Sequence, residues 1–256
     1  MNVRPVLTLA ALVVLAVPPA RAETADQWIA KARSYLGSES DLLAVKSVHF
    51  VGSIEAITKV PAPEDKTKMV DQPVKLPAEI VFQKPYQQRI TITKPASIDT
   101  TALDDYDGWS RSTSVANPAQ WRVTLLDARQ IKTLRANTWE NLYFYAGIER
   151  RGGRVELGGD STVDGVACVK LSFIHDTTIV FQRYFEKATG RLVKTVTENG
   201  AEIREEGEVV VHGVKFPRKV INKSPNGQNS TIIFDQVTVN ETIPVSDFAV
   251  PNFQAN

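Results

Sequence analysis

Cysteine is almost absent from this sequence, because Cys168 is the only one in 256 residues. A single cysteine excludes an internal disulfide framework. Cys168 lies in an alternating apolar segment, which favours burial as a small inert side chain over a reactive thiol. The fold must therefore be held by an ordinary apolar core, and the chain is long enough to form one as a single domain.

Long apolar runs are also absent beyond the N-terminus. Residues 1–22 have the pattern of a secretory signal, with Arg4, a short apolar stretch and a cleavage site at Ala20-Arg21-Ala22. The stretch is too short to span a bilayer, and no later segment is longer. We expect export, cleavage, and a soluble periplasmic protein made of one domain, residues 23–256.

An excess of either charge is missing too. The chain has 30 basic and 29 acidic residues, and loss of Arg4 and Arg21 with the signal leaves 28 and 29. Nucleic-acid binding requires a basic stripe, so we expect no nucleic-acid partner.

Patterns typical of catalysis and metal binding are likewise missing. The three histidines, His49, His175 and His212, are far apart and have no second ligand at a familiar spacing. There is no G-x-S-x-G motif. Two of the 29 acidic residues could still meet as a pair for sugar hydrolysis, but nothing in the sequence selects them. We expect no enzyme, no metal and no cofactor.

Turn signals are abundant in the second half of the chain. Glycine and asparagine adopt the positive φ that tight hairpins require. The turn pairs are Asp164-Gly165, Thr189-Gly190, Asn199-Gly200, His212-Gly213 and Asn226-Gly227. The strands they predict are Val163–His175, Ile179–Glu186, Arg191–Glu198, Glu202–Val211, Val214–Lys223 and Ser230–Asn240. Such an antiparallel meander covers one apolar face. Glu205, Glu206 and Glu208 alternate along one of these strands and are expected to be solvent-facing charges.

The first half predicts a helix followed by strands. Thr24 or Asp26 can cap the helix, and Gly37 ends it. Four prolines make residues 60–77 a predicted loop insertion. Alternating apolar residues on the strands around it are Phe50, Ile80, Phe82, Ile90 and Ile92, and Asp107-Gly108 predicts a further hairpin.

The middle of the chain, residues 125–147, predicts two short helices. Asp127 with Gln130 forms a capping box for the first, and Thr138 is placed to cap the second. Trp139, Leu142 and Tyr143 form an apolar stripe on the second helix. The simplest interpretation is that these helices plug the sheet as ordinary core.

Several motifs resemble the LolA-type outer-membrane lipoprotein-sorting family and its lipid-carrier relatives. They are Phe82-Gln83-Lys84-Pro85 followed by Arg89-Ile90-Thr91-Ile92, Tyr106-Asp107-Gly108-Trp109, Val163-Asp164-Gly165-Val166, Phe185 to Val193, and the tail from Val239 through Phe248 to Pro251. Each motif consists mainly of residues that any tight turn favours, so no single motif identifies the family. The resemblance depends on the order of the motifs along most of the mature chain.

The resemblance implies a mainly β (α+β) fold: a single curved antiparallel sheet forming an incomplete β-barrel, with an N-terminal helix and short lid helices over the concave face. In that family the cavity receives acyl chains. Burying about fifteen methylenes is worth roughly 12 kcal/mol, so such a chain needs shielding from water. The implied cavity-lining residues are Phe50, Ile80, Phe82, Ile90, Ile92, Trp139, Leu142 and Tyr143.

One position departs from the family pattern. The basic residue before the hairpin proline is Lys84, where the best-known carriers have an arginine that latches the lid. Lysine lacks the planar fork of arginine, so a multi-pronged latch would be weaker. The chain is also longer than the small proteobacterial carriers, partly through residues 60–77.

Besides a hydrolase whose site the sequence does not reveal, two functions stay open at this point. The first is a monomeric periplasmic carrier that binds acyl chains of lipoproteins or lipids and moves them toward the outer membrane, between an inner-membrane donor and an outer-membrane acceptor protein. The second is a sensor or protein-docking module on the same fold that transports nothing.

Overall fold

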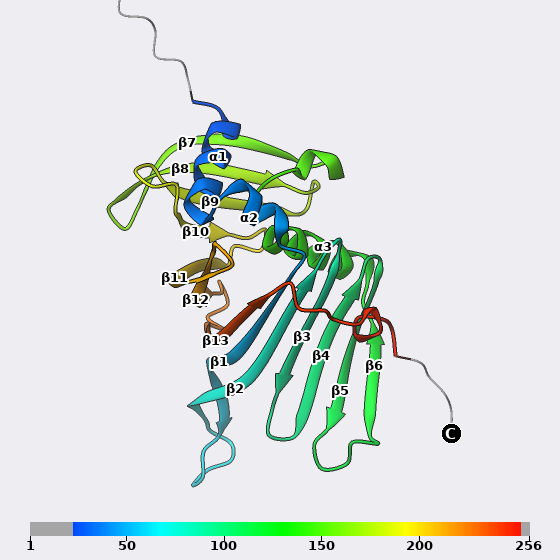
Figure 1. Cartoon of the computed structure of the whole chain (residues 1–256). Helices are drawn as coiled ribbons and strands as arrows, with labels where there is room; N and C mark the ends of the chain where they lie inside the picture. The colour runs from blue at the N-terminus through cyan, green and yellow to red at the C-terminus, as the bar shows by residue number, and fades with distance from the viewer. Residues whose placement is uncertain (1–22, 252–256) are drawn as a thin grey trace, which may run out of the picture.

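The computed structural model describes residues 23–251, and the predicted signal sequence lies outside them. Its main element is one antiparallel sheet of 13 strands that is not closed on itself (Figure 1). The strand order is β6-β5-β4-β3-β2-β1-β13-β12-β11-β10-β9-β8-β7. The predicted fold class, a single curved antiparallel sheet with an N-terminal helix, is confirmed.

The strands are β1 (Ser47–Pro61), β2 (Met69–Gln83), β3 (Gln87–Thr93), β4 (Ser97–Asp104), β5 (Asp107–Ser114), β6 (Trp121–Leu125), β7 (Arg154–Val163), β8 (Val166–Ile174), β9 (Val180–Glu186), β10 (Leu192–Val196), β11 (Glu202–Val211), β12 (Val214–Lys223) and β13 (Ser230–Val239). The helices are α1 (Ala25–Leu36), α2 (Glu39–Ala44) and α3 (Ala128–Leu142), with short 3₁₀ turns η1 (Ile148–Arg151) and η2 (Val245–Asp247).

Two-residue turn chemistry sets the meander of the second half. All five predicted turn pairs lie between consecutive strands from β7 to β13. Asp164 and Gly165 have φ of 49° and 80°, and His212 and Gly213 have φ of 48° and 77°. Positive φ at both turn residues matches the right-handed twist of the strands on either side. These predictions are confirmed.

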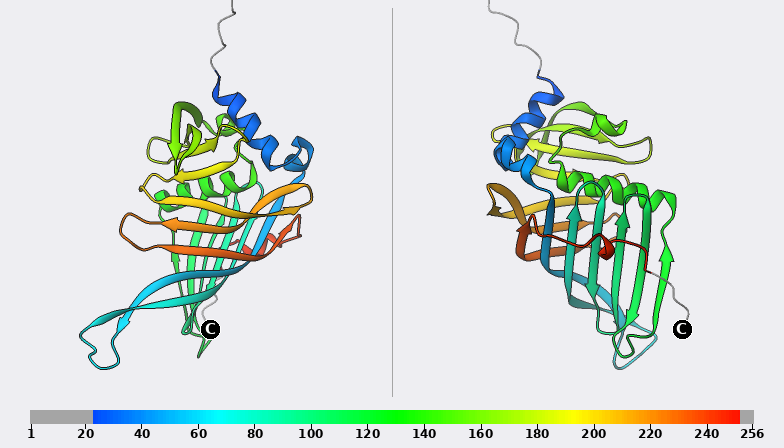
Figure 2. Two further views of the ribbon diagram at one scale, coloured as in Figure 1. Left: turned by 90° about the vertical axis from the view of Figure 1, so that its left-hand side faces the viewer. Right: turned by 45° about the vertical axis from the view of Figure 1, so that its right-hand side comes forward.

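The first and last strands along the chain pair with each other in the middle of the sheet. β1 and β13 run antiparallel from Val48–Val239 to Ala56–Ser230, and this seam joins the half made of β1–β6 to the half made of β7–β13. Between the halves the chain passes through α3, which contacts β2, β3, β4 and β5 and lies across their ends (Figure 2).

The helices differ from expectation in the middle of the chain. Thr24 caps α1 through the capping box with Gln27, and Asp127 caps α3 in the same way. Residues 128–142 form one helix where we predicted two. Thr138 lies inside α3 and donates its hydroxyl hydrogen to the Leu134 carbonyl, so it caps nothing.

The prediction of a loop over residues 60–77 is wrong for most of the segment. β1 continues to Pro61 and β2 begins at Met69, so the two strands form a long hairpin. Pro73 and Pro77 are tolerated because β3 pairs with β2 only from Ala78 onward. Before that point β2 is an edge strand, where a missing N–H costs no ladder hydrogen bond.

Two strands were not predicted. β6 is largely exposed, and β7 carries Gly158-Gly159 at a register shift against β8. β6 alternates apolar and polar residues over only five positions, and in β7 the alternation is broken by Gly158-Gly159, so neither gave a clear strand signal.

The core consists of two clusters, and α3 contributes to both. Trp139 packs with Phe173 and Phe185 of the β7–β10 region, whereas Leu142 packs with Phe50 and side chains of β1, β2, β12 and β13. Cys168 is fully buried as expected, and burial raises the pKa of its thiol. Within the described residues, no helix has the length and apolar character needed to span a membrane.

The seam gives the first prediction. A β-carbon placed on Gly52 would lie 1.9 Å from the Ile233 carbonyl oxygen of β13. We expect Gly52→Ala to lower the free energy of unfolding by about 1–3 kcal/mol, because the seam must shift to admit a methyl group. Urea unfolding followed by tryptophan fluorescence measures this.

The neighbouring Ser53→Ala is the matched control. The Ser53 hydroxyl is buried and has no hydrogen-bond partner among the described residues, so its removal breaks no hydrogen bond. Equal stability of Gly52→Ala and Ser53→Ala would show that the seam is not tightly packed.

Candidate functional site

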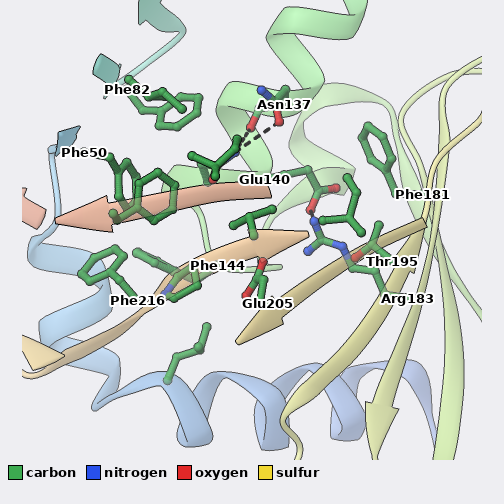
Figure 3. Close-up of a pocket in the computed structure, with 18 of the residues that line it drawn as sticks. Phe50, Phe82, Asn137, Glu140, Phe144, Phe181, Arg183, Thr195, Glu205 and Phe216 are labelled. Atoms are coloured by element: carbon green, nitrogen blue, oxygen red, sulfur yellow. Dashed lines mark hydrogen bonds and ion pairs between the residues drawn. The ribbon is translucent and has the colours of Figure 1, made fainter. Parts of the chain in front are cut away.

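A cavity of about 270 Å³ lies beneath α3, between the two halves of the sheet (Figure 3). One end of it is apolar and largely aromatic. The side chains there are Phe50, Ile80, Phe82, Ile90, Phe216, Val220, Ile232 and Phe234. The Phe50 ring contacts three of the others, with centroid distances of 6.4 Å to Phe82, 6.0 Å to Phe216 and 4.5 Å to Phe234. This end provides an apolar wall built from β1, β2, β3, β12 and β13.

The other end of the cavity is polar. Arg183, Thr195 and Ile203 pair across β9, β10 and β11 as a row on one face. Glu205 follows two residues along β11, so it points to the same side. Glu205 is solvent-exposed, as expected, and its side chain also lines this end of the cavity.

Helix α3 covers the cavity with polar side chains. Asn137, Glu140 and Asn141 recur at helical spacing and face the hollow, while Phe144 lines it just past the helix. These short amides do not reach the opposite wall, which is one reason why the space beneath α3 stays open.

Glu140 ties α3 to the second half of the sheet. Its side chain is 3% exposed and lies 2.6 Å from His175 Nε2, as a hydrogen bond, and 2.6 Å from Arg183 Nη2, as an ion pair. The Arg183 guanidinium also lies against the rings of Tyr145 and Phe173, at 4.8 and 5.1 Å from their centroids. Buried ions require partners of this kind, because removal of one leaves the other charged and unpaired.

Glu205 has no comparable partner. It makes no hydrogen bond or ion pair with any residue in the described range 23–251, and its side chain lines the cavity while part of it stays open to solvent. Loss of hydration raises the pKa of its carboxyl, and the nearby positive charge of Arg183 opposes that rise.

A second hollow of about 360 Å³ adjoins the cavity beneath α1. It exists because β10 and β11 pair only at Thr195–Ile203 and Val196–Glu202 and then diverge. Glu205 and Phe216 line both spaces, which makes the hollow a continuation of the polar end of the cavity.

The C-terminal end of α3 is held by Arg33 of α1. Arg33 Nη1 donates to the carbonyls of Tyr143 and Phe144, at 2.9 and 2.7 Å, and so satisfies groups that a helix end leaves unpaired. Phe144 and Tyr145 both have positive φ, 48° and 72°. This conformation is costly for bulky side chains, so the turn after α3 is strained and depends on its surroundings.

The structure brings half of the predicted lining residues to the cavity. Phe50, Ile80, Phe82 and Ile90 line it. Ile92 does not, because β3 carries it past the end of the hollow.

The three candidates on α3 do not line the cavity either. Trp139 and Leu142 are buried in the two core clusters, and Tyr143 packs beside them. The apolar stripe of α3 therefore packs against the sheet on either side of the cavity. The polar face of the same helix covers the hollow.

Lys84 lies against the last turn of α3. Its Nζ is 5.1 Å from the centre of the Tyr143 ring, a cation–π contact. The Nζ forms no hydrogen bond to any described residue, whereas the Lys84 backbone N–H donates to the Lys46 carbonyl. Burial and the like charge of Arg33 lower the pKa of Lys84. Its role as a latch stays a prediction, and the direct hydrogen bonds to this helix end come from Arg33.

Sequence reasoning missed the polar groups of the site. Glu140 interrupts an apolar stripe, which is a weak signal, and its partners His175 and Arg183 are distant in sequence. Across residues 23–251, no three His, Cys, Asp or Glu side chains are grouped so that they could hold a metal ion.

Comparison with known proteins gives likenesses of fold. No protein-family model and no curated protein matches the sequence. Among solved structures, a LolA superfamily protein from Nitrosomonas europaea matches over 90% of this chain and 99% of its own, with a TM-score of 0.57 and 14% identity. A candidate outer membrane lipoprotein-sorting protein domain from Vibrio parahaemolyticus matches over 86% and 95%, with a TM-score of 0.53 and 12% identity.

A DUF1329 family protein from Desulfovibrio piger is similar over 89% of this chain and 98% of its own, with a TM-score of 0.53 and 10% identity. At these identities the matches show the fold alone. The chain has a LolA-like fold, as the resemblance of its motifs predicted.

The ion pair of Glu140 with Arg183 gives a second prediction. We expect Glu140→Gln to lower the free energy of unfolding by about 3–5 kcal/mol, because it leaves the buried Arg183 without its counter-charge. Urea unfolding measures the change. Glu149→Gln on the exposed η1 turn is the control and should lie within about 0.5 kcal/mol of the parent. A Glu140 variant as stable as this control would contradict the account of α3.

The raised pKa of Glu205 gives a prediction for pH. A carboxyl with a raised pKa holds its proton more tightly when folded, so its stability contribution falls as pH rises through and above the ordinary value of 4.5. We expect Glu205→Gln to be more stable than the parent at pH 7, with the difference vanishing toward pH 3.5. Thermal unfolding at several pH values measures this, and a variant less stable at pH 7 would refute it.

Proposed function

We propose that this protein is a non-enzymatic periplasmic carrier that binds acyl chains of lipoproteins or lipids beneath α3 and moves them toward the outer membrane. The observation that supports the proposal best is the aromatic and aliphatic cavity between α3 and both halves of the sheet. In this proposal the acyl chain lies against Phe50, Phe82 and Ile90, three of the residues predicted from the sequence to line the cavity.

The physical reason is the cost of exposing hydrocarbon. Each methylene moved out of water contributes about 0.8 kcal/mol, so a long acyl chain crosses an aqueous compartment only inside an apolar pocket. The apolar end is lined by uncharged side chains, among them Phe50, Ile80, Phe82 and Phe234. It therefore offers the acyl chain a hydrocarbon-like environment.

The size of the cavity determines how a chain would fit. About 270 Å³ is slightly below the roughly 300–1,000 Å³ of ordinary ligand pockets. A long chain would extend into the adjoining hollow beneath α1 or displace α3. The strained turn at Phe144 and Tyr145 supports such a displacement, since strain of this kind is relieved by movement.

Delivery also requires partners. We propose an inner-membrane donor and an outer-membrane acceptor protein, with Lys84 and Arg33 holding the C-terminal end of α3 until the load is passed on. Both residues already contact that end of the helix.

Native mass spectrometry of protein purified gently from the periplasm tests the function. A carrier should retain acyl-chain ligands that dissociate on collisional activation. A protein that is consistently empty, and yet elutes with another protein, would refute the carrier and favour the docking module.

A cavity-filling variant gives a further prediction. We expect Ile232→Trp to weaken binding of a fluorescent fatty-acid probe by about tenfold, because the indole occupies the space meant for the chain, while the fold is retained. Val210→Trp is the matched control, since Val210 is 62% exposed on β11 and lies outside the cavity. Equal probe affinity of the two variants would place the acyl site elsewhere.

A further inference from the structure

Two charged groups at the polar end of the cavity have unmet hydrogen-bonding capacity. Arg183 is nine-tenths buried, and its Nε and Nη1 have no hydrogen-bond partner among the described residues. Glu205, which is partly open to solvent, has no protein partner either. In Figure 3 the Arg183 guanidinium lies between the Glu140 carboxylate and Glu205. A buried charged donor left unpaired is costly, and its presence calls for an explanation.

Packing fixes these groups in place. The Arg183 guanidinium is held against the rings of Tyr145 and Phe173 and by its ion pair with Glu140. Thr195, its cross-strand neighbour on β10, is 5% exposed. The site therefore presents hydrogen-bond donors from Arg183 and an acceptor from Glu205 at the end of an apolar cavity.

We propose that this end of the cavity is a head-group subsite for a single-chain amphiphile with an uncharged hydroxyl or amide head, as in a monoacylglycerol. Such a head accepts hydrogen bonds from Arg183 and donates one to Glu205, while its chain lies along the Phe50 end. The inference rests on the proposed function and specifies the class of ligand.

Charge selects against other head groups. The local groups are two cations, Arg183 and Lys215, and two carboxyls, Glu140 and Glu205. His175 lies on the far side of Glu140, and the charge of Lys215 is paired with Glu208. A phosphate head would add negative charge between the two carboxyls. A quaternary ammonium head has no hydrogen to donate to Glu205 and would meet the like charge of Arg183. An uncharged protic head avoids both conflicts.

The test compares three amphiphiles with the same sixteen-carbon chain. They are monopalmitoylglycerol, palmitoyl lysophosphatidic acid and hexadecyltrimethylammonium, used below their micelle concentrations to displace a fluorescent fatty-acid probe. We expect the monoacylglycerol to bind at least about tenfold more tightly than the other two. Equal or tighter binding of either charged amphiphile would overturn the proposal.

Variants of Glu205 identify the group that recognises the head. Glu205→Leu should weaken monoacylglycerol binding by about tenfold and leave the probe bound, because it removes the acceptor and keeps the apolar wall. Glu202→Leu is the control, since Glu202 points to the opposite side of β11, lines neither hollow and pairs with Lys194. Unchanged monoacylglycerol affinity in Glu205→Leu would overturn the role of Glu205.

The outcomes separate this inference from the proposed function. If neither the probe nor any of the three amphiphiles binds the parent protein, the carrier function fails and the subsite fails with it. If all bind with the same affinity, the carrier function stands and the subsite alone is refuted.

Discussion

The attachment of α3 at its two flanks, and not at its centre, is the constraint on which the site depends. Trp139 is buried in one core cluster and Leu142 in the other, so the helix rests on both halves of an open sheet. Between these anchors it presents Asn137, Glu140 and Asn141, which are too short and too polar to fill the space below. A helix with an apolar residue at each of these positions would close the hollow, since protein interiors pack to high density.

Glu140 shows how this polar face is made compatible with burial. A lone carboxylate in that position would be strongly unfavourable, but His175 and Arg183 flank it at hydrogen-bonding distance. The same guanidinium borders the cavity, so one side chain both fixes the helix and gives the hollow its polar end. The lining is thus amphipathic, with aromatic rings on β1, β2, β12 and β13 and charged groups on β9 and β11.

Local chemistry was readable from the sequence, and long-range chemistry was not. Turn pairs such as Asp164-Gly165 specify their own backbone conformation, so the hairpins of the second half were predictable. Pro73 and Pro77 suggested a loop because their tolerance depends on where β3 ends, which no local pattern records. On α3 the stripe containing Trp139 and Leu142 was found but assigned to the cavity. The rule that apolar faces point inward does not distinguish a core from a hollow beside it. Glu140 and Arg183 were missed because their pairing joins a helix to a strand more than forty residues away.

The pairing of β1 with β13 also governs the order in which this protein can assemble. Val48 meets Val239 across roughly 190 intervening residues, so the strand pairing with the greatest sequence separation is also the one that unites the sheet. A chain that emerges from its N-terminus first cannot complete the seam until its last strand has appeared. The cavity draws its walls from both sides of that seam, so it is complete only once β13 has paired with β1, and a chain cut short before β13 would expose the phenylalanines of the cavity to water.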